Sequence, residues 1–362
     1  MKKIFQLLLG WLALPAAFAG NVLTMAVGTY TDSGSHGIYS MRFNQSTGEA
    51  AVLDSLKMSN PSFLTFSDDA RCIYAVNENG GADAALSAVR FSPSTGHMTL
   101  INTVRTFGAD PCYVETDGRV ALTANYTGGS MTVFPINDDG SLGEKLFLFS
   151  GTTGGKHPRQ STAHVHTARF FDKNTILATD FSADRLLRFH VDGTAVTDDG
   201  VAGFTLPSSG PRHLEFLRKK DFVYAINELA GTVTVFRNTG KDLERIQTIV
   251  SDSLGGRGCA DIHLSPDGRF LYASNRLKGD GISVFKVDRK KGTLQKTGYV
   301  LTGEHPRNFA ITHNGRFLLC ACRDSNVIQV FAVDRKSGML KDTHRNIPLK
   351  KPVCIRFSNR IK

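Results

Sequence analysis

Two histidines, His164 and His166, stand two residues apart in the apolar stretch at residues 163–170. Side chains two residues apart on a strand share one face, so both imidazoles would project in the same direction. An imidazole exchanges a proton near neutral pH, which makes either histidine a candidate general base. Considered alone, each histidine is explained equally well as a structural residue that is hydrogen-bonded in the core or in the channel lining.

Further charged groups follow later in the chain. Arg212, Arg276 and Arg307 can bind an anionic substrate and stabilise an oxyanion that forms at an attacked ester carbonyl. Glu228 can hold an arginine in place, orient water or exchange a proton. The chain contains no Gly-x-Ser-x-Gly motif, no phosphate-binding glycine loop and no zinc-ligand spacing. We therefore expect neither a covalent serine, nor a metal, nor any other cofactor.

Asn and Asp recur at the ends of several expected strands. Such residues commonly cap the loop that follows them, and that is the interpretation we adopt for most of them. Their oxygens also suit Ca²⁺, but Arg212 and Arg276 nearby would oppose a cation. We keep Asp180 as a candidate substrate-binding residue, together with His166, Asp261 and Arg307.

A two-part unit that recurs seven times positions these residues. Its first part is a short strand introduced by a turn residue, often Pro, and its second part is a hairpin of alternating apolar and small residues. A more polar segment follows most hairpins, for example residues 100–106 and 243–249, and we expect it to be an exposed outer strand. The seven first strands lie at residues 60–64, 110–114, 163–168, 210–214, 260–264, 305–309 and 351–355.

Seven four-stranded units of about fifty residues predict an all-β fold, a seven-bladed β-propeller. The first unit starts at its hairpin, at residues 23–29, and lacks an inner strand. The last segment, residues 352–358, is an inner strand without a hairpin. Pairing the two would close the ring and remove an open sheet edge. A pair of β-sandwiches, the alternative all-β architecture, would not explain these complementary ends.

In a propeller the inner strand of each blade lines the central channel. The repeat alignment places four polar residues in consecutive blades at one level, which favours a site over a uniformly polar channel. That level is Ser62, Cys112, His164, Arg212, Asp261, Arg307 and Val353. His166 lies two residues further along the same strand, on the same face and deeper in the channel. At the ends of the second strands, the same repeat alignment makes Gly28 equivalent to Asn77. His164 is thus the stronger candidate for catalysis and His166 for binding.

The N-terminus has the features of a signal peptide. Lys2 and Lys3 precede an apolar run at residues 4–14, and small residues flank a cleavage site after Ala19. We predict a signal peptide at 1–19, a propeller domain at 20–362 and a periplasmic or secreted protein without stable membrane insertion; a retained anchor is the alternative.

Charge and cysteine content narrow the partners and the redox chemistry. The net charge of +10 is scattered, which argues against nucleic-acid binding and is compatible with attraction of small anions. The six cysteines lie mostly among apolar neighbours, so we expect buried thiols, although an oxidising compartment permits disulfides.

Five segments together resemble the lactonase family of seven-bladed propellers, which includes propeller-type 6-phosphogluconolactonases and fungal carboxymuconate cyclases. They are residues 163–166, 180–185, 210–213, 224–228 and 265–276. The resemblance covers nearly the whole mature chain and implies a metal-independent site in the channel mouth. The catalytic His, two Arg and Glu proposed for the family match His164, Arg212, Arg276 and Glu228. The sequence departs from the family at Ala163, usually Pro, and at residues 180–182, usually Asp-Leu-Gly.

The resemblance implies hydrolysis of a sugar lactone, phosphorylated or not, to the aldonic acid. In this hypothesis His164 activates water, the arginines hold the oxyanion, and the partner is a small, anionic lactone. Two alternatives stay open. One is a non-enzymatic periplasmic binding or scaffold propeller, and the other is a lactone-forming cycloisomerase of the carboxymuconate type.

Overall fold

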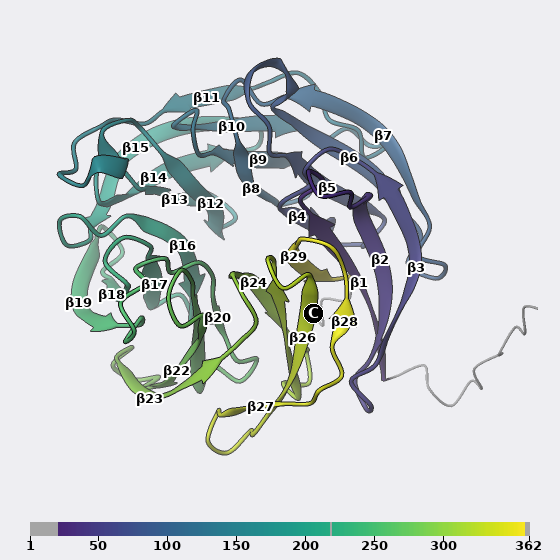
Figure 1. The fold of residues 1–362 in the computed structure, drawn as a ribbon. Helices are drawn as coiled ribbons and strands as arrows, with labels where there is room; N and C mark the ends of the chain where they lie inside the picture. Colours follow the sequence, from purple (N-terminus) through teal and green to yellow (C-terminus); the bar gives the residue numbers. More distant parts are fainter. Residues whose placement is uncertain (1–20, 218, 359–362) are drawn as a thin grey trace, which may run out of the picture.

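The computed structural model describes residues 21–217 and 219–358. They form seven antiparallel sheets arranged as blades in a ring, each blade one copy of the predicted repeat (Figure 1). The helical segments among these residues are two short 3₁₀ turns, η2 (Gly81–Asp83) and η3 (Pro158–Gln160). The predicted seven-bladed propeller is therefore confirmed.

In every blade the strands follow one another outward from the channel axis. Blade 1 is β29 (Pro352–Phe357), β1 (Val22–Thr29), β2 (Gly37–Asn44) and β3 (Ala50–Lys57); blade 2 is β4 (Leu64–Phe66), β5 (Cys72–Asn77), β6 (Ala85–Phe91) and β7 (Met98–Arg105); blade 3 is β8 (Pro111–Thr116), β9 (Val120–Asn125), β10 (Ser130–Pro135) and β11 (Phe147–Ser150). Blade 4 is β12 (Val165–Asp172), β13 (Thr175–Asp180), β14 (Arg185–Asp192) and β15 (Ala195–Phe204); blade 5 is β16 (Pro211–Phe216), β17 (Phe222–Asn227), β18 (Thr232–Asn238) and β19 (Leu243–Val250). Blade 6 is β20 (Ile262–Leu264), β21 (Phe270–Asn275), β22 (Gly281–Val287) and β23 (Leu294–Leu301); blade 7 is β24 (Pro306–Ile311), β25 (Phe317–Cys322), β26 (Val327–Val333) and β27 (Leu340–Asp342), with β28 (Ile347–Pro348) also paired to β26.

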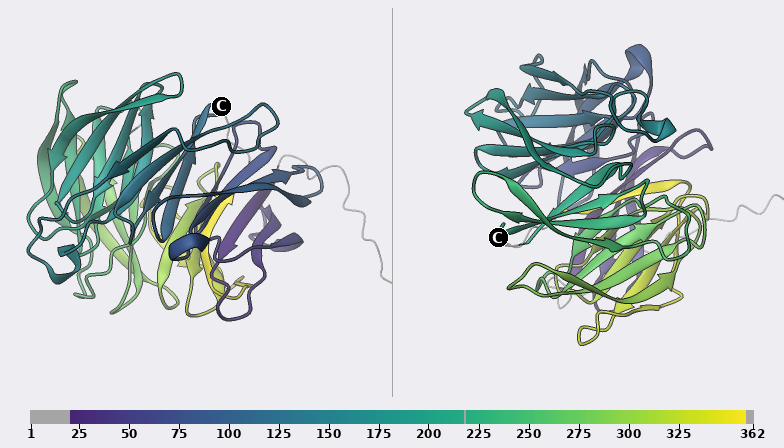
Figure 2. Two further views of the ribbon diagram at one scale, coloured as in Figure 1. Left: turned by 90° about the horizontal axis from the view of Figure 1, so that it is seen from above. Right: turned by 90° about the vertical axis from the view of Figure 1, so that its left-hand side faces the viewer.

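The two ends of the chain close the ring. Strand β29 pairs antiparallel with β1, and Gly28 lies opposite Cys354. Both views of Figure 2 show the yellow C-terminal segment, which contains β29, beside the purple first blade. Because β29 supplies the inner strand that blade 1 lacks, this blade does not expose the inner edge of β1. The predicted closure is confirmed.

Burial falls from the second strand of each blade to the fourth. Every residue of β5, β9, β17, β21 and β25 is buried, whereas the outer strands, such as β3 and β19, are largely exposed or half-buried, as predicted. Neighbouring blades are also joined by buried tyrosines. The hydroxyls of Tyr74, Tyr224 and Tyr272 donate to the carbonyls of Gly140, Gly292 and Gly338 in the next blade, at 3.1, 3.0 and 2.9 Å.

A β-bulge in the inner strands corrects part of the predicted register. Pairing skips one residue between Pro111 and Tyr113, and the equivalent skipped residues in β12, β16 and β24 are His166, Arg212 and Arg307. The expected equivalence of His164 with Arg212 is wrong, because His166 occupies that position. The bulge adds one unpaired residue to the inner strand, which a repeat alignment by turn residues does not detect.

Two further positions shift for the same reason. Asp261 bonds through its backbone to Ser274, as His213 pairs with Ile226 one blade earlier, so Asp261 is equivalent to His213 and not to Arg212. In blade 1, consecutive residues Gly28 and Thr29 of β1 pair with residues of β29 that are two apart, so the unpaired residue again lies on the inner strand. Thr29, not Gly28, therefore matches Asn77, and Tyr30 takes the place that Glu78 and Glu228 hold in their blades.

All six cysteines are buried and free, which confirms the expectation of buried thiols. Cys320 and Cys322, two residues apart on β25, lie with their sulfurs 3.8 Å apart. Within residues 21–217 and 219–358, no helix is long and apolar enough to span a bilayer. The predicted signal peptide, 1–19, lies outside the described residues.

Candidate active site at one mouth of the channel

The inner strands all run in one direction, so their first residues gather at one end of the channel. The last residues of the second strands lie opposite them, as Pro211 lies opposite Asn227. The side chains that follow these second strands, Glu228 and Arg276 among them, therefore belong to the same end as Arg212 and Arg307. We call this end the Glu228 mouth.

Three guanidinium groups surround the Glu228 carboxylate. Its Oε1 lies 2.7 Å from Arg159 Nη1, and its Oε2 lies 3.0 Å from Arg212 Nε and 3.3 Å from Arg276 Nη2. The side chains of Glu228, Arg212 and Arg276 are all less than a tenth exposed. Burial alone would raise the pKa of Glu228, but Arg276, Arg212 and Arg159 outweigh it and lower that pKa to about 2. Glu228 is therefore ionised at any ordinary pH and serves to hold the arginines.

Backbone carbonyls and neutral histidines fix two of these arginines further. Arg212 Nη1 donates to the carbonyl of Ala260 at 2.6 Å and to His213 Nε2 at 3.1 Å. Arg276 Nε donates to the carbonyl of Gly258 at 2.7 Å, and its Nη1 to His305 Nε2 at 3.1 Å. Both guanidinium groups are thus held rigidly at the channel mouth.

Burial and neighbouring charges lower the pKa values of both Arg276 and His305. Burial, followed by the charges of Arg276, Arg323 and Arg307, lowers the pKa of His305 to about 2, so His305 accepts as a neutral ring. Burial, opposed by Glu228, lowers the pKa of Arg276 to about 9, which leaves it protonated at neutral pH. The Arg276–His305 contact therefore joins a cation to a neutral acceptor.

Sequence reasoning missed Arg159, the third arginine on Glu228. Arg159 belongs to η3, in the long connection between β11 and β12, and its side chain is 43% exposed. Its Nη2 donates to the Tyr126 hydroxyl at 2.7 Å, and its guanidinium lies 5.3 Å from the ring of Phe181. The available signal was the length of this connection, since long ordered loops often carry functional residues.

Local hydrogen bonds hold the Arg159 loop over the mouth. His157 caps η3 by accepting from the backbone N–H of Arg159. Gln160, fully buried, donates to the carbonyl of Phe181 at 2.9 Å and to Asp184 Oδ1 at 2.8 Å. Because Gln160 anchors the turn, the neighbouring Arg159 is directed toward Glu228.

His164 lies beside this loop, at the edge of the mouth. Its Nδ1 lies 2.8 Å from the carbonyl oxygen of Tyr126, which can only accept, so Nδ1 carries the proton and Nε2 is the acceptor nitrogen. The ring stacks on Tyr126 with centroids 4.2 Å apart, and Nε2 accepts from the exposed hydroxyl of Thr162 at 3.1 Å. Tyr126 thus joins His164 to Arg159, and the acceptor nitrogen of His164 lies on the exposed side of the mouth.

Arg307, predicted to bind substrate, lies in a second charge cluster of the same mouth. Its Nη2 lies 3.2 Å from Glu78 Oε2, while the Tyr30 hydroxyl donates to Glu78 Oε1 at 2.8 Å. The positive charge of Arg307 also contributes to the lowered pKa of Arg276. Glu78 neutralises Arg307, so the excess positive charge of the mouth comes from the three arginines on Glu228.

The other predicted binding residues lie apart from the Glu228 contacts. His166 is 5% exposed, with Nδ1 3.6 Å from Cys112 Sγ. Asp180 is fully buried, and its oxygens accept from Arg185 Nε at 3.0 Å and from a backbone N–H. Asp261 is 1% exposed and is bonded to two histidines deeper in the channel. The one-residue shift at the bulge accounts for the deeper position of Asp261.

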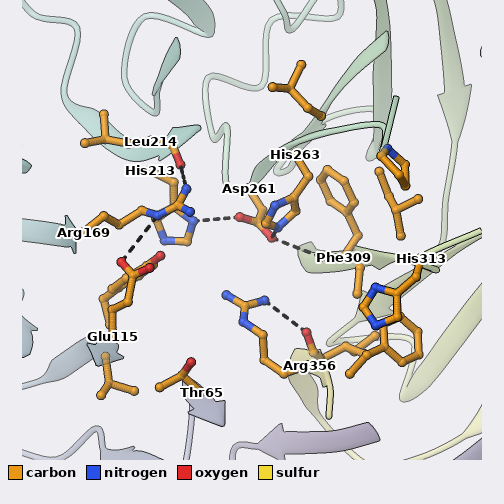
Figure 3. A pocket seen from close by; sticks show the side chains of 18 residues that line it. Thr65, Glu115, Arg169, His213, Leu214, Asp261, His263, Phe309, His313 and Arg356 are labelled. Atoms are coloured by element: carbon orange, nitrogen blue, oxygen red, sulfur yellow. Dashed lines mark hydrogen bonds and ion pairs between the residues drawn. The ribbon is translucent and has the colours of Figure 1, made fainter. Parts of the chain in front are cut away.

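Aromatic side chains fill the middle of the channel. The rings of Phe63 and Tyr113 lie 4.2 Å apart, and that of His213 lies 5.3 Å from Tyr113 and 5.8 Å from Phe63. On the far side of these three rings, the last residues of the inner strands surround a cavity of about 260 Å³ (Figure 3). We call it the Arg356 chamber; its lining includes Thr65, Glu115, Arg169, His263, Phe309 and Arg356.

The Glu228 mouth is suited to binding an anion or a developing negative charge. Three guanidinium groups face one carboxylate, and hydrogen bonds hold them before any substrate arrives. Over residues 21–217 and 219–358, no three His, Cys, Asp or Glu side chains gather as a set of metal ligands. The guanidinium donors can bind negative charge, and the imidazole of His164 can accept a proton.

Comparisons with known proteins agree with this architecture. The family model described as "Lactonase, 7-bladed beta-propeller" matches residues 24–357. A 6-phosphogluconolactonase of Bacillus subtilis strain 168 is 31% identical over 348 residues, which cover 92% of this chain and 98% of the relative. A solved structure from Bacteroides uniformis ATCC 8492, provisionally named a 6-phosphogluconolactonase, is 51% identical, with a TM-score of 0.91 over 93% of this chain and 99% of that one.

A third relative carries a cellular location in its description. The periplasmic gluconolactonase PpgL of Pseudomonas aeruginosa is 33% identical to this chain. Its solved structure gives a TM-score of 0.87, covering 93% of this chain and 99% of PpgL. The similarity therefore extends over whole chains and not over single blades.

Proposed function

The chain belongs to the lactonase family of seven-bladed β-propellers, and from this membership we propose that it hydrolyses a sugar lactone to the corresponding aldonic acid. The observation that carries the proposal is the buried Glu228 carboxylate shared by three arginines at the channel mouth. This arrangement leaves two guanidinium charges uncompensated where the negative charge of an opening lactone would form.

The proposed reaction uses the residues of the mouth in distinct roles. His164 Nε2 removes a proton from water, and the resulting hydroxide oxygen bonds to the lactone carbonyl carbon. Arg212 and Arg276 donate to the oxyanion that forms there. The tetrahedral intermediate collapses by breaking the ring C–O bond, and protonated His164 returns the proton to the departing alkoxide. Glu228, ionised throughout, keeps the two guanidinium groups in position.

The substrate class follows from charge and location. The excess positive charge of the mouth favours an anionic lactone or one whose acid product is held as an anion. We propose a periplasmic or secreted location, on the predicted signal peptide and the periplasmic gluconolactonase among the similar structures. Export favours an unphosphorylated sugar lactone, because phosphorylated sugar lactones are cytosolic metabolites.

A lactone panel with pH-stat detection tests the proposal. Gluconolactone, 6-phosphogluconolactone and other sugar lactones are assayed with the mature chain, corrected for spontaneous opening. We expect His164→Ala to lower kcat by about 10²–10⁴ and Arg276→Gln by about 10²–10³, while His344→Ala, at an exposed position, keeps the wild-type rate.

Each contrary result has a defined meaning. A wild-type rate for His164→Ala would refute its role as base. No hydrolysis of any lactone would favour the binding or scaffold alternative. Lactone formation from an unsaturated diacid, without hydrolysis, would favour the cycloisomerase.

A further inference from the structure

The Arg356 chamber is a polar cavity separate from the proposed active site. It lies at the ends of the inner strands, whereas Glu228 and its arginines lie at their beginnings. The rings of Phe63, Tyr113 and His213 stand between the two. The chamber therefore needs an explanation of its own.

Paired charges occupy one side of the chamber. Consecutive blades contribute Glu115, Arg169, Glu215 and His263 at one level, so that acidic and basic groups alternate. Glu115, Arg169 and His263 line the cavity, and Glu215 pairs with the last two from behind them. Arg169 Nε lies 3.5 Å from Glu115, its Nη1 lies 3.7 Å from Glu215, and His263 Nδ1 lies 3.2 Å from Glu215. Each of these four side chains thus has an oppositely charged partner among the other three.

His263 adds a positive charge to this wall. Both of its ring nitrogens face carboxylates, Nδ1 facing Glu215 and Nε2 facing Asp261 at 3.0 Å. Burial opposes protonation, but Asp261 and Glu215 raise the pKa of His263 to about 9. Arg169 and His263 together therefore nearly balance Glu115, Glu215 and Asp261, and Arg356 supplies the last positive charge.

Arg356 is the charged side chain of the chamber that has no carboxylate in direct contact. Its Nη1 donates to the carbonyl of the adjacent Ile355 at 3.0 Å, and its guanidinium lies 4.5 Å from the centre of the Phe63 ring. Among the residues that the structure describes, no Asp or Glu oxygen lies within 4.0 Å of it. Figure 3 shows the guanidinium extending into the space between Glu115, Asp261 and Phe309. Its remaining donors are therefore directed at the contents of the chamber.

We propose that the Arg356 chamber binds a small monocarboxylate. A guanidinium matches a carboxylate with two parallel N–H donors, and this one has no carboxylate from the wall. Because the other charges around the chamber are paired with one another, the single guanidinium of Arg356 matches one negative charge, and a dianion such as phosphate would leave its second charge without a partner. The volume of about 260 Å³ lies below that of a drug-sized site and admits only a small molecule. Phe309 and Phe357 provide apolar wall for its body.

Calorimetric titration of the mature chain tests this proposal. Benzoate and gluconate serve as monocarboxylates with an apolar and a hydroxylated body, and inorganic phosphate serves as the dianion. We expect at least one monocarboxylate to bind at one site per chain, and to bind more tightly than phosphate. Arg356→Gln should weaken that binding tenfold or more, and Arg237→Gln, at an exposed ion pair, should leave it unchanged.

Two further variants guard against loss of fold and against binding elsewhere. Thr65→Asp keeps Arg356 but places a carboxylate on the neighbouring inner strand, so it should also weaken binding. Arg276→Gln alters the Glu228 mouth and should leave unchanged the affinity of the site that Arg356→Gln weakens. The proposal is overturned if neither monocarboxylate binds, if phosphate binds more tightly, or if the affinity survives in Arg356→Gln. Binding lost in Arg276→Gln alone would also overturn it.

Discussion

Replacing Glu228 by Gln removes the one negative charge that three arginines share. The substitution keeps the size of the side chain and leaves Arg159, Arg212 and Arg276 without their common counter-ion at 2.7, 3.0 and 3.3 Å. Two of these guanidinium groups are nearly inaccessible to water, so solvent cannot replace the lost charge. We therefore expect the folded state to be strongly destabilised.

The magnitude follows from the pKa of Glu228. A fall from the ordinary 4.5 to about 2 corresponds to about 3 kcal/mol of extra stabilisation of the carboxylate in the folded chain. Removal of one partner from a buried ion pair costs about 3–5 kcal/mol in general. A change of this size should lower Tm by roughly 5–10 °C.

The sign of the pH dependence supplies a second measurement. Because the pKa of Glu228 is lower in the folded chain, its contribution is complete above pH 4.5 and is lost as the pH falls toward 2. The difference in unfolding free energy between wild type and Glu228→Gln should therefore be largest at neutral pH. It should shrink below pH 4.5.

Calorimetry with added sulfate distinguishes a charge effect from a packing effect. An anion can occupy the mouth of Glu228→Gln, where the guanidinium groups are unpaired, so sulfate at constant ionic strength should raise the Tm of the variant more than that of wild type. Glu244→Gln is the matched control, because Glu244 forms an exposed pair with Arg237 and should cost about 1 kcal/mol or less. Equal Tm values for Glu228→Gln and wild type, or an equal response to sulfate, would refute the reasoning.

Three further predictions follow from other parts of the structure. Arg159→Ala should raise KM about tenfold at nearly unchanged Tm, measured by steady-state lactone hydrolysis and calorimetry, because this arginine is 43% exposed and its ion pair is partly solvated; an unchanged KM would contradict its place in the site. The folded-state pKa of His263 is raised to about 9, so the unfolding free energy should fall by up to about 3 kcal/mol between pH 6.5 and 9. In urea titrations, the unfolding free energy of His263→Gln should not show this decrease with pH. A chain ending at Lys351 lacks β29 and should show no cooperative thermal transition, whereas a chain ending at Ser358 should unfold like wild type.

The architecture could be predicted from the sequence because the residues of the repeat have strong local preferences for strand or turn conformation. Turn residues introduce each inner strand, and the complementary segments at the two ends identify the closing strand, so blade number and closure both follow. The grouping of Arg212, Glu228 and Arg276 was also accessible, because a repeat places equivalent residues at one end of the channel.

The exact depth of each site residue was not accessible from the repeat. A bulge adds one unpaired residue at His166 and Arg212, and it changes register without changing the apolar pattern on either side. Alignment by the turn residue therefore placed His164 and Asp261 at the wrong level. Arg159 was missed for a different reason, since it comes from a connection outside the repeat, where no equivalent position in another blade marks it.

A continuous series of contacts joins the two ends of the channel and decides which variants are informative. Arg212, which binds Glu228, contacts His213 at 3.1 Å; His213 contacts Asp261 at 2.8 Å, and Asp261 contacts His263 in the chamber wall at 3.0 Å. Replacing a middle member would leave charges unpaired on both sides, so its effects could not be assigned to one end. Arg159 and Arg356 lie outside this series, at opposite ends of the channel. Substitutions there change one site while the connecting contacts stay intact, and for that reason they separate lactone hydrolysis from carboxylate binding.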